Sequence, residues 1–392
     1  MPFDLLLTGG RIIDPSQGLD VISDVGINDG RIAQIGPHLD REGCPDVREI
    51  AGKLVCPGLI DLHGHWYEGG LYGVDPLLCL NHGVTTAVDA GTTGYANFPE
   101  FERTALNDCP TDVLAFIHIS FMGLHSPFAE ELVNLEYARP RETADLIEKH
   151  RERAIGVKVR IGTMTGNHGL AALDKALIAA AEANVPLMAH ISKGAEEREI
   201  LRRLRPGDVL THCFHGRGNG MIHDGIIAEA REARNRGVFF DVGHGCGSFS
   251  WDSARRAFEH DFYPDTISTD LHRYCATEPL CVTLPQVMSK MLCIGMSLHD
   301  VILKTTAVPA KVLGREQDIG SLRPGTQADV LVFEVEPGNF SFTDTHLKVC
   351  YGSERIVPKL VVKRGRPYLP GSLPVRLRDL YESDLAVFRS IG

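Results

Sequence analysis

The amino-acid sequence predicts an α/β fold, a (β/α)8 TIM barrel with a small β-sandwich domain built from both chain termini. Eight short apolar runs recur between residues 58 and 272, and segments with helical periodicity separate most of them. Short β-like pieces precede this region and return after it. The length of 392 residues exceeds that of one ordinary compact core but suits a large barrel with a smaller domain.

The two ends of the chain form the expected small domain. The first 55 residues resemble the hairpins of a sheet, with the turn signal Asn28-Asp29-Gly30 between two β-like pieces. Strand-like sequence returns after residue 318. We therefore expect a small β domain at residues 1–55 and 318–392, and a barrel at residues 56–317.

The apolar runs of the middle region define the barrel strands. They cover residues 58–65, 85–91, 113–120, 155–161, 186–192, 208–216, 238–245 and 266–272. An alanine-rich helix between the fourth and fifth runs is expected to stop at Asn184, before Pro186. A later helix is expected to end on Gly237, a favourable C-cap residue. A doubly wound open sheet is the alternative, but no GxGxxG motif follows the first run.

Composition and charge argue against several classes of partner. Forty basic residues against 51 acidic residues give a net charge of −11, and no Lys/Arg cluster stands out. Neither nucleic acid nor an anionic membrane is therefore expected as a partner. No apolar stretch reaches the roughly 18 residues of a membrane helix, and no secretory signal is visible. Ten scattered cysteines without CxxC pairs favour reduced thiols in a cytoplasmic protein.

Candidate metal ligands recur at the ends of the expected strands, where the catalytic groups of such barrels lie. His63 and His65 end the first run and share one face, so both imidazoles can bind one ion. Later runs place four more candidates at matching positions: Lys158, His190, His212 and Asp270. A lone histidine on an apolar strand is usually a core residue, but six residues in this pattern predict a metal site.

Lys158 is the unusual member of this set. It alternates with Val157 and Val159, and the polar face of such a strand ordinarily points to water. Beside metal-binding histidines, a lysine can instead react with CO2 and become a carbamate, which is an anionic oxygen ligand. Nearby cations would lower the pKa of the amine and stabilise the carbamate. We therefore expect Lys158 to bridge two divalent ions.

These motifs resemble those of the amidohydrolase superfamily over nearly the whole chain. PGLIDLHGH (57–65) looks like the first-strand signature of that superfamily, and GVKVR (156–160) like the fourth-strand carbamate lysine of its binuclear members. STDLH (268–272) is similar to the eighth-strand aspartate motif. GSLRPGTQADVLVF (320–333) is similar to the segment that leads back into the β domain.

The resemblance implies two divalent metal ions, with zinc expected and manganese, iron or cobalt as alternatives. It implies that the first ion is held by His63, His65 and Asp270, and the second by His190 and His212. Carbamylated Lys158 and a hydroxide would lie between the ions. The hydroxide would attack a carbonyl, while Asp270 accepts a proton and passes it to the leaving group.

The expected substrate is a small acylated molecule, most simply an acetylated anion with an amide or ester bond. Dihydroorotase-like enzymes usually have an arginine two residues after the second histidine, where this chain has Tyr67. HGHWYEGG looks closer to a related branch whose members act as deacetylases. A cyclic amide hydrolase is the alternative. A nucleobase deaminase, typically with HxxE after the fifth strand, and a barrel without enzymatic activity are further alternatives.

An anionic substrate requires a cation in the pocket. Arg160 shares the face of Lys158, and Arg273 follows Asp270, although each could equally be a structural arginine. The remaining candidate substrate contacts are Tyr67, His215, His244 and His272. Oligomers are common among similar barrels, so a homo-oligomer is expected.

Overall fold

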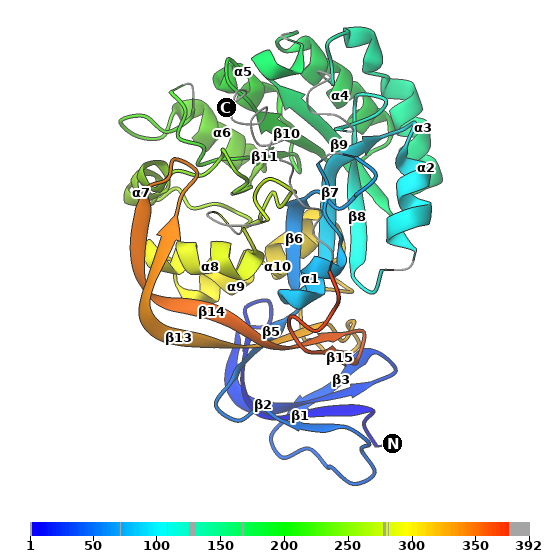
Figure 1. Ribbon diagram of the computed structural model, residues 1–392, viewed down its shortest axis with the longest axis vertical. Coiled ribbons are helices and arrows are strands. Elements are labelled where there is room, and N and C mark those ends of the chain that lie inside the picture. Colours follow the sequence, from blue (N-terminus) through cyan, green and yellow to red (C-terminus); the bar gives the residue numbers. More distant parts are fainter. Residues whose placement is uncertain are drawn as a thin grey trace.

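Two β-sheets organise the protein, whose computed structural model describes residues 2–70, 72–107, 109–124, 131–166, 168–218, 220–276, 280 and 282–375. A parallel sheet of seven strands forms the larger body, and a sheet of eight strands includes the N-terminal end of the molecule (Figure 1). The candidate residues for catalysis lie in the larger body.

The seven-stranded sheet has the order β12-β11-β10-β9-β8-β7-β6, with every neighbouring pair parallel. Its strands are β6 (Leu59–Gly64), β7 (Val84–Gly94), β8 (Asp112–His118), β9 (Ala154–Ile161), β10 (Leu187–Ile191), β11 (Val209–Thr211) and β12 (Phe239–Phe240). Nearly every residue of these strands is buried, which explains why their sequences are continuous apolar runs instead of alternating ones. Each of the first seven predicted runs overlaps one of these strands.

The eighth predicted run closes the sheet without forming a continuous strand. Thr266 makes a parallel bridge to the residue after β12, and Leu271 makes another to the last residue of β6. Two backbone N–H groups that a β-ladder would use are bonded to side chains instead. Thr269 N donates to Asp61 Oδ1, and Leu271 N donates to Thr269 Oγ1. The prediction of a regular strand at 266–272 was therefore wrong, although the seven strands and these bridges form a TIM-barrel-like ring.

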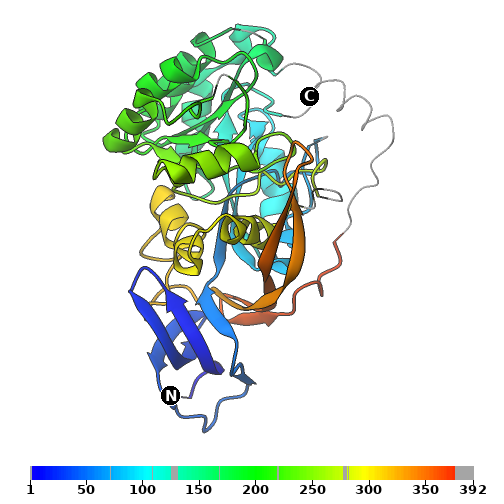
Figure 2. The same ribbon diagram turned by 90° about the vertical axis from the view of Figure 1, so that its left-hand side faces the viewer.

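Helices follow most strands and cover the outside of the barrel (Figures 1 and 2). They are α1 (Leu77–Asn81), α2 (Phe98–Phe101), α3 (Pro140–Lys149), α4 (Ala171–Glu182), α5 (Glu197–Arg203), α6 (Ala228–Arg236), α7 (Trp251–Glu259), α8 (Leu284–Cys293), α9 (Leu298–Leu303) and α10 (Ala307–Val312). Asn184 and Gly237 have φ values of +51° and +98°, so both predicted stop signals adopt the left-handed conformation of a helix end. Within the described ranges, no helix combines the length and the apolar character needed to cross a membrane.

The eight-stranded sheet combines strands from both ends of the chain. Its strands are β1 (Leu5–Asp14), β2 (Leu19–Asn28), β3 (Arg31–Gly36), β4 (Val47–Glu49), β5 (Leu54–Pro57), β13 (Val330–Thr343), β14 (Val349–Lys363) and β15 (Arg366–Tyr368). β5 pairs with β1 on one side and with β13 on the other. A separate hydrophobic cluster, which includes Leu5, Ile27, Val55 and Val330, supports this sheet. The described strands of both ends lie in one sheet, so the predicted sandwich of two packed sheets stays a prediction.

The hairpin of β13 and β14 extends from this sheet along the side of the barrel near α7 and α8 (Figure 1). Phe342 and Ile356 of the hairpin belong to the hydrophobic cluster of the barrel. At the hairpin's far end, Asp344 Oδ2 accepts a hydrogen bond from Trp251 N, and Thr345 N donates to Phe249 O. The hairpin therefore supports the loop between β12 and α7.

Candidate metal centre

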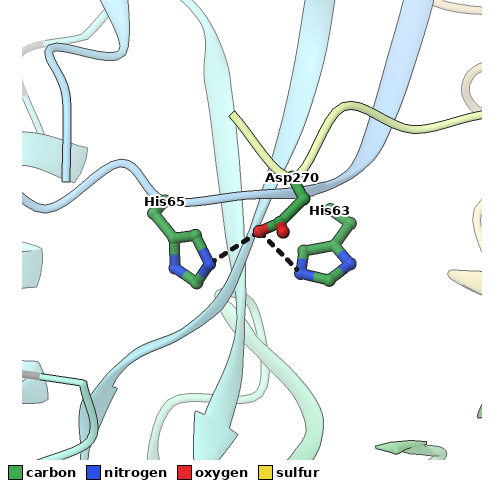
Figure 3. A group of neighbouring side chains, drawn as sticks. All are labelled: His63, His65 and Asp270. Atoms are coloured by element: carbon green, nitrogen blue, oxygen red, sulfur yellow. Dashed lines mark hydrogen bonds and ion pairs between the residues drawn. The ribbon is translucent and has the colours of Figure 1, made fainter. Parts of the chain in front are cut away.

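Three buried side chains converge at the carboxyl end of the barrel (Figure 3). His63 lies on β6, and His65 is the first residue after that strand. Asp270 belongs to the segment 266–272, which makes bridges to the residue after β12 and to the last residue of β6. Asp270 Oδ1 lies 3.0 Å from His65 Nε2 and 3.3 Å from His63 Nε2. Potential ligand atoms of all three residues lie within 4.8 Å of one another. Two imidazoles and a carboxylate in this arrangement could hold one metal ion.

The other three predicted ligands adjoin this group. Lys158 on β9 places Nζ 3.2 Å from His63 Nε2. His190 on β10 and His212 just after β11 face each other, with 2.6 Å between Nδ1 of His190 and Nε2 of His212. His212 Nε2 is 4.0 Å from Asp270 Oδ2. The fold thus brings all six residues into one contiguous group.

Burial sets the protonation of most nitrogen donors in this group. It lowers the pKa of His65 to about 4 and holds the pKa values of His190 and His212 well below the usual range. Burial also lowers the pKa of Lys158 to about 7, so a large fraction of the amine is uncharged at neutral pH. Neutral imidazoles can act as metal ligands, and a neutral amine can add to CO2.

Asp270 and His63 shift the pKa of each other within the group. Burial would raise the pKa of Asp270, but His63 and His65 outweigh it and hold this pKa well below the usual range. For His63, burial and Lys158 lower the pKa, whereas Asp270 and Asp241 outweigh them and raise it. Asp270 is therefore an ionised acceptor, and a cation bound here would favour the neutral form of His63.

A hydroxyl and a buried carboxylate orient His63. The hydroxyl of Thr211 donates to Asp241 Oδ2 at 2.7 Å and lies 2.8 Å from His63 Nδ1. Because the hydroxyl proton goes to Asp241, the oxygen of Thr211 accepts from Nδ1–H of the imidazole. This leaves Nε2 of His63 directed at Lys158 and Asp270, because a hydrogen bond at one ring nitrogen fixes the orientation of the imidazole.

A second hydroxyl orients His65. Its Nδ1 lies 2.8 Å from Thr92 Oγ1, and the backbone N–H of Thr92 donates to the buried Asp89 at 2.8 Å. The ring of His212 has a backbone partner instead, with 2.6 Å between Nδ1 and the carbonyl oxygen of Gly243. In each of these histidines, one ring nitrogen contacts a hydrogen-bond partner outside the group, and the other ring nitrogen faces the group.

Gly91 allows β7 to approach Lys158 closely. Its φ is +88°, and a Cβ placed there would lie 2.8 Å from Lys158 Cβ and 2.7 Å from Lys158 Cγ. A larger residue would thus be strained twice, by its backbone conformation and by collision with the lysine stem.

Gly91→Ala is expected to lower the free energy of unfolding by about 3 kcal/mol, combining left-handed strain with overpacking. Gly207→Ala is the matched control, because Gly207 has φ +90° and no described atom within 4 Å of a Cβ. That change should cost only about 1 kcal/mol. Urea unfolding of both variants measures the difference, and equal losses would show that the collision with Lys158 has no energetic consequence.

Arg160 lies beside the six-residue group, two residues after Lys158 on β9. It is buried, and its Nε is 3.4 Å from Glu131 Oε1, which is also 3.7 Å from His118 Nε2. Among the described residues, these three atoms have no partner with hydrogen-bond geometry. Arg160 was predicted from the sequence, whereas Glu131 and His118 were not, because they are far apart in sequence and carry no shared motif.

The structure places Tyr67 away from the metal group. Its ring packs against Phe101 of α2, with 5.1 Å between the ring centres, and lines a separate pocket beside α1 and α2. Tyr72, which was not predicted from the sequence, has its ring centre 4.9 Å from that of His65 and 4.5 Å from that of His272. The chain reverses after His65, which brings the later tyrosine back over the histidines.

His272 and Arg273 lie on the side of the group lined by Tyr72. The ring centre of His272 is 6.1 Å from that of His65. The backbone N–H of Arg273 donates to the carbonyl oxygen of Tyr72 at 2.9 Å. Both residues are buried. This geometry keeps His272 within reach of a molecule bound at His65.

His215 and His244 have other partners. His215 Nε2 lies 3.5 Å from Glu197 Oε2 at the start of α5. His244 stacks on Phe249, and its Nε2 accepts a hydrogen bond of 2.7 Å from Lys290 on α8. Through these contacts both histidines support the loops after β11 and β12.

Comparisons with known proteins place these residues in context. The model of the amidohydrolase family matches residues 54–367. A deacetylase of Enterococcus faecalis is 30% identical over 94% of this chain and 100% of its own length, and it is one of three relatives named deacetylase at 30–32% identity. A solved structure described as an adenine deaminase has a TM-score of 0.87 at 29% identity, covering 94% of this chain and 100% of its own. One described as a dihydroorotase has a TM-score of 0.86 at 29% identity, with 93% and 98% covered.

Proposed function

The chain belongs to the amidohydrolase family, and from that premise we propose that it is a binuclear metal-dependent deacetylase of small, acylated anions. It is a hydrolase that acts on C–N bonds. The observation that carries the proposal is the convergence of six candidate donors, five of them buried and His190 partly buried, beside a buried arginine.

The donor set fits divalent metal ions, and zinc in particular. His63, His65 and Asp270 offer two imidazoles and an ionised carboxylate to a first ion. His190 and His212 direct Nδ1 and Nε2 at one another and would hold a second ion. Two such cations, when bound, supply Lewis-acid activation of the scissile carbonyl and of the attacking water.

Lys158 and Asp270 provide the chemistry of the chain itself. The uncharged amine of Lys158 adds to CO2, forms an N–C bond and loses a proton, which leaves a carbamate between the two histidine pairs. Asp270 accepts a proton from the attacking water on a carboxylate oxygen and returns it to the departing nitrogen or oxygen. The products are a carboxylate and an amine or alcohol.

Arg160 supplies the positive charge for an anionic substrate. It is buried close to the metal group, and its nearest carboxylate, Glu131, does not hydrogen-bond to its Nε. The side chain of Arg160 is 10% exposed, and its guanidinium would donate a charge-assisted hydrogen bond to a substrate carboxylate on the exposed side. The acyl carbonyl would then lie between Arg160 and the ligand histidines.

Cyclic amide hydrolysis is the second candidate, because a solved dihydroorotase structure is so similar in fold. The packing of Tyr67 on Phe101 argues against it. Dihydroorotase-like enzymes use the residue at that position to bind the carboxylate of the ring, whereas Tyr67 points toward α2. We therefore favour an open-chain acyl substrate.

Elemental analysis and a substrate panel test this proposal. Protein from cells grown with added zinc should contain two ions per chain and should hydrolyse N-acetyl or O-acetyl acids faster than cyclic amides. A preference for rings would support the second candidate. One ion or none, in protein that is folded and active, would contradict the binuclear site.

Arg160→Met is expected to raise KM for an acetylated acid by about 100-fold, because a buried charge-assisted contact is lost. The KM for the matching neutral methyl ester should change little. Steady-state kinetics of both substrates separate this effect from a general loss of structure. Equal changes for acid and ester would show that Arg160 does not bind the anion.

The two chain ends are proposed to form a small β-sandwich domain, at residues 1–55 and 318–392, around a barrel at residues 56–317. A hydrophobic cluster that joins Leu5 and Val55 to Val330 and Val362 supports this division. We further propose that the protein acts in the cytoplasm as a homo-oligomer on a small-molecule substrate.

A further inference from the structure

Three residues near the end of α8 contact the β13–β14 hairpin. Ser289 Oγ accepts a hydrogen bond of 2.9 Å from Ile356 N. Lys290 Nζ donates to the carbonyl oxygen of Thr343 at 2.6 Å. The last residue of α8, Cys293, then faces the second residue of β14, Cys350. The hairpin therefore lies against α8 along its whole final turn.

Cys293 and Cys350 have their sulfur atoms 3.0 Å apart, although 57 positions separate them in the chain. A disulfide has a sulfur–sulfur distance of about 2.05 Å, so a shift of about 1 Å would join them. Gly352 allows this approach, because a Cβ there would lie 3.3 Å from both Cβ and Sγ of Cys293. Both cysteines are partly exposed, so a small reagent can reach them.

A cation lies beside one member of the pair. Arg255 of α7 places Nη2 2.9 Å from Cys350 Sγ. A guanidinium stabilises the negative charge that a sulfur carries when it attacks a disulfide. Burial and the neighbouring sulfur of Cys350 raise the pKa of Cys293 to about 12. Cys350 is therefore the expected attacking sulfur, and Cys293 the one that acts second.

We propose that Cys293 and Cys350 are a reversible redox modification site, which low-molecular-weight disulfides oxidise to an intramolecular disulfide. Cys350 attacks such a reagent, RSSR, to form Cys350–S–S–R and release one RSH. Cys293 then displaces the second RSH and forms the Cys293–Cys350 bond. The two protein thiols lose two hydrogen atoms, and RSSR is reduced to two RSH. The formation of this disulfide does not depend on the proposed hydrolytic function.

The Cys293–Cys350 bond would fix the hairpin to α8, the helix that supports the loop after β12 beside the candidate metal centre. Lys290 lies one helical turn before Cys293 and donates to His244 Nε2, next to Gly245. A Cβ on Gly245 would lie 2.3 Å from Asp270 Oδ2, so this loop packs directly against the carboxylate. Tying the hairpin to α8 therefore restrains the elements that support the loop after β12.

Mass spectrometry of the full-length protein after treatment with glutathione disulfide tests the proposal. The expected product has lost two hydrogen atoms, and peptide mapping should locate the link between residues 293 and 350. Cys293→Ser should instead accumulate a stable glutathione adduct on Cys350, because the second step is blocked. Adducts on both cysteines of the unaltered protein, without the link, would overturn the proposal.

Cys44→Ser is the matched control, because Cys44 is also partly exposed but lies in the N-terminal part of the chain with its sulfur near Asp46 O. This variant should form the link as fast as the unaltered protein. Oxidation should also raise Tm by about 5 °C, through closure of a long loop, and dithiothreitol should reverse the shift. An equal Tm shift in Cys293→Ser, or no shift in linked protein, would show that the bond does not fasten the hairpin.

Discussion

An Asp270→Asn protein is expected to lose about 10³-fold in turnover while keeping its fold. Asparagine matches aspartate in size and tolerates the φ of +48° at this position, so the backbone can be retained. Its amide cannot accept a proton from the attacking water. It also removes the negative charge that lies 3.0 Å from His65 Nε2 and 3.3 Å from His63 Nε2.

The measurement is steady-state turnover with excess zinc, alongside metal content and circular dichroism. Asp145→Asn provides the control, because Asp145 is an exposed carboxylate of α3 whose nearest cation, Arg141, is 4.0 Å away. That variant should keep normal turnover. An Asp270→Asn enzyme with both metals and near-normal turnover would rule out the proton-transfer role.

Lys158→Ala is expected to bind less than two ions per chain and to lose at least 100-fold in activity, because the group between the histidine pairs is gone. Lys158→Met tests the same loss without a large cavity, since methionine nearly fills the space of the buried stem. If the carbamate is required, both variants should lose metal content and turnover to the same extent. Metal content and turnover, each measured at saturating zinc, check this result.

Added carboxylate distinguishes the carbamate from a merely structural lysine. Acetate or propionate can enter the cavity left in Lys158→Ala and supply oxygen ligands, so partial recovery of metal and activity is expected. Lys158→Met leaves no room and should not recover. In the unaltered protein, 13C-labelled bicarbonate should produce a carbamate signal by NMR. Full activity in Lys158→Ala without additives would show that the lysine does not bridge metals.

The barrel and the six-residue group were predictable because the apolar runs mark the strands and the candidate ligands occur near the ends of those runs. In a parallel barrel the carboxyl ends of all strands meet at one face, so His63, His190 and Asp270 had to be neighbours once the strands were identified. The irregular eighth segment was not predictable. Its apolar pattern matches a strand, but Asp61 and Thr269 satisfy its donors through side chains.

Loop residues and supporting residues were harder to predict for physical reasons. Tyr67 and Tyr72 follow the same strand, and only the path of the loop decides which ring returns to the histidines. Thr211 and Asp241 look like ordinary strand-end residues until their hydrogen bonds are visible. Cys293 and Cys350 meet because the β13–β14 hairpin extends along α8, and composition has no signal for that contact.

The hydroxyl supports of His63 and His65 also have a consequence for how such a centre can change over evolutionary time. Thr211 and Thr92 hold the two rings from β11 and β7, inside the barrel framework and apart from the Tyr72 loop. The rings are ordered when the chain folds, so no later loss of side-chain entropy opposes ion capture. Replacing the outer loops can then alter substrate choice while the reactive core stays assembled, which lets one scaffold diversify without first dismantling its chemistry.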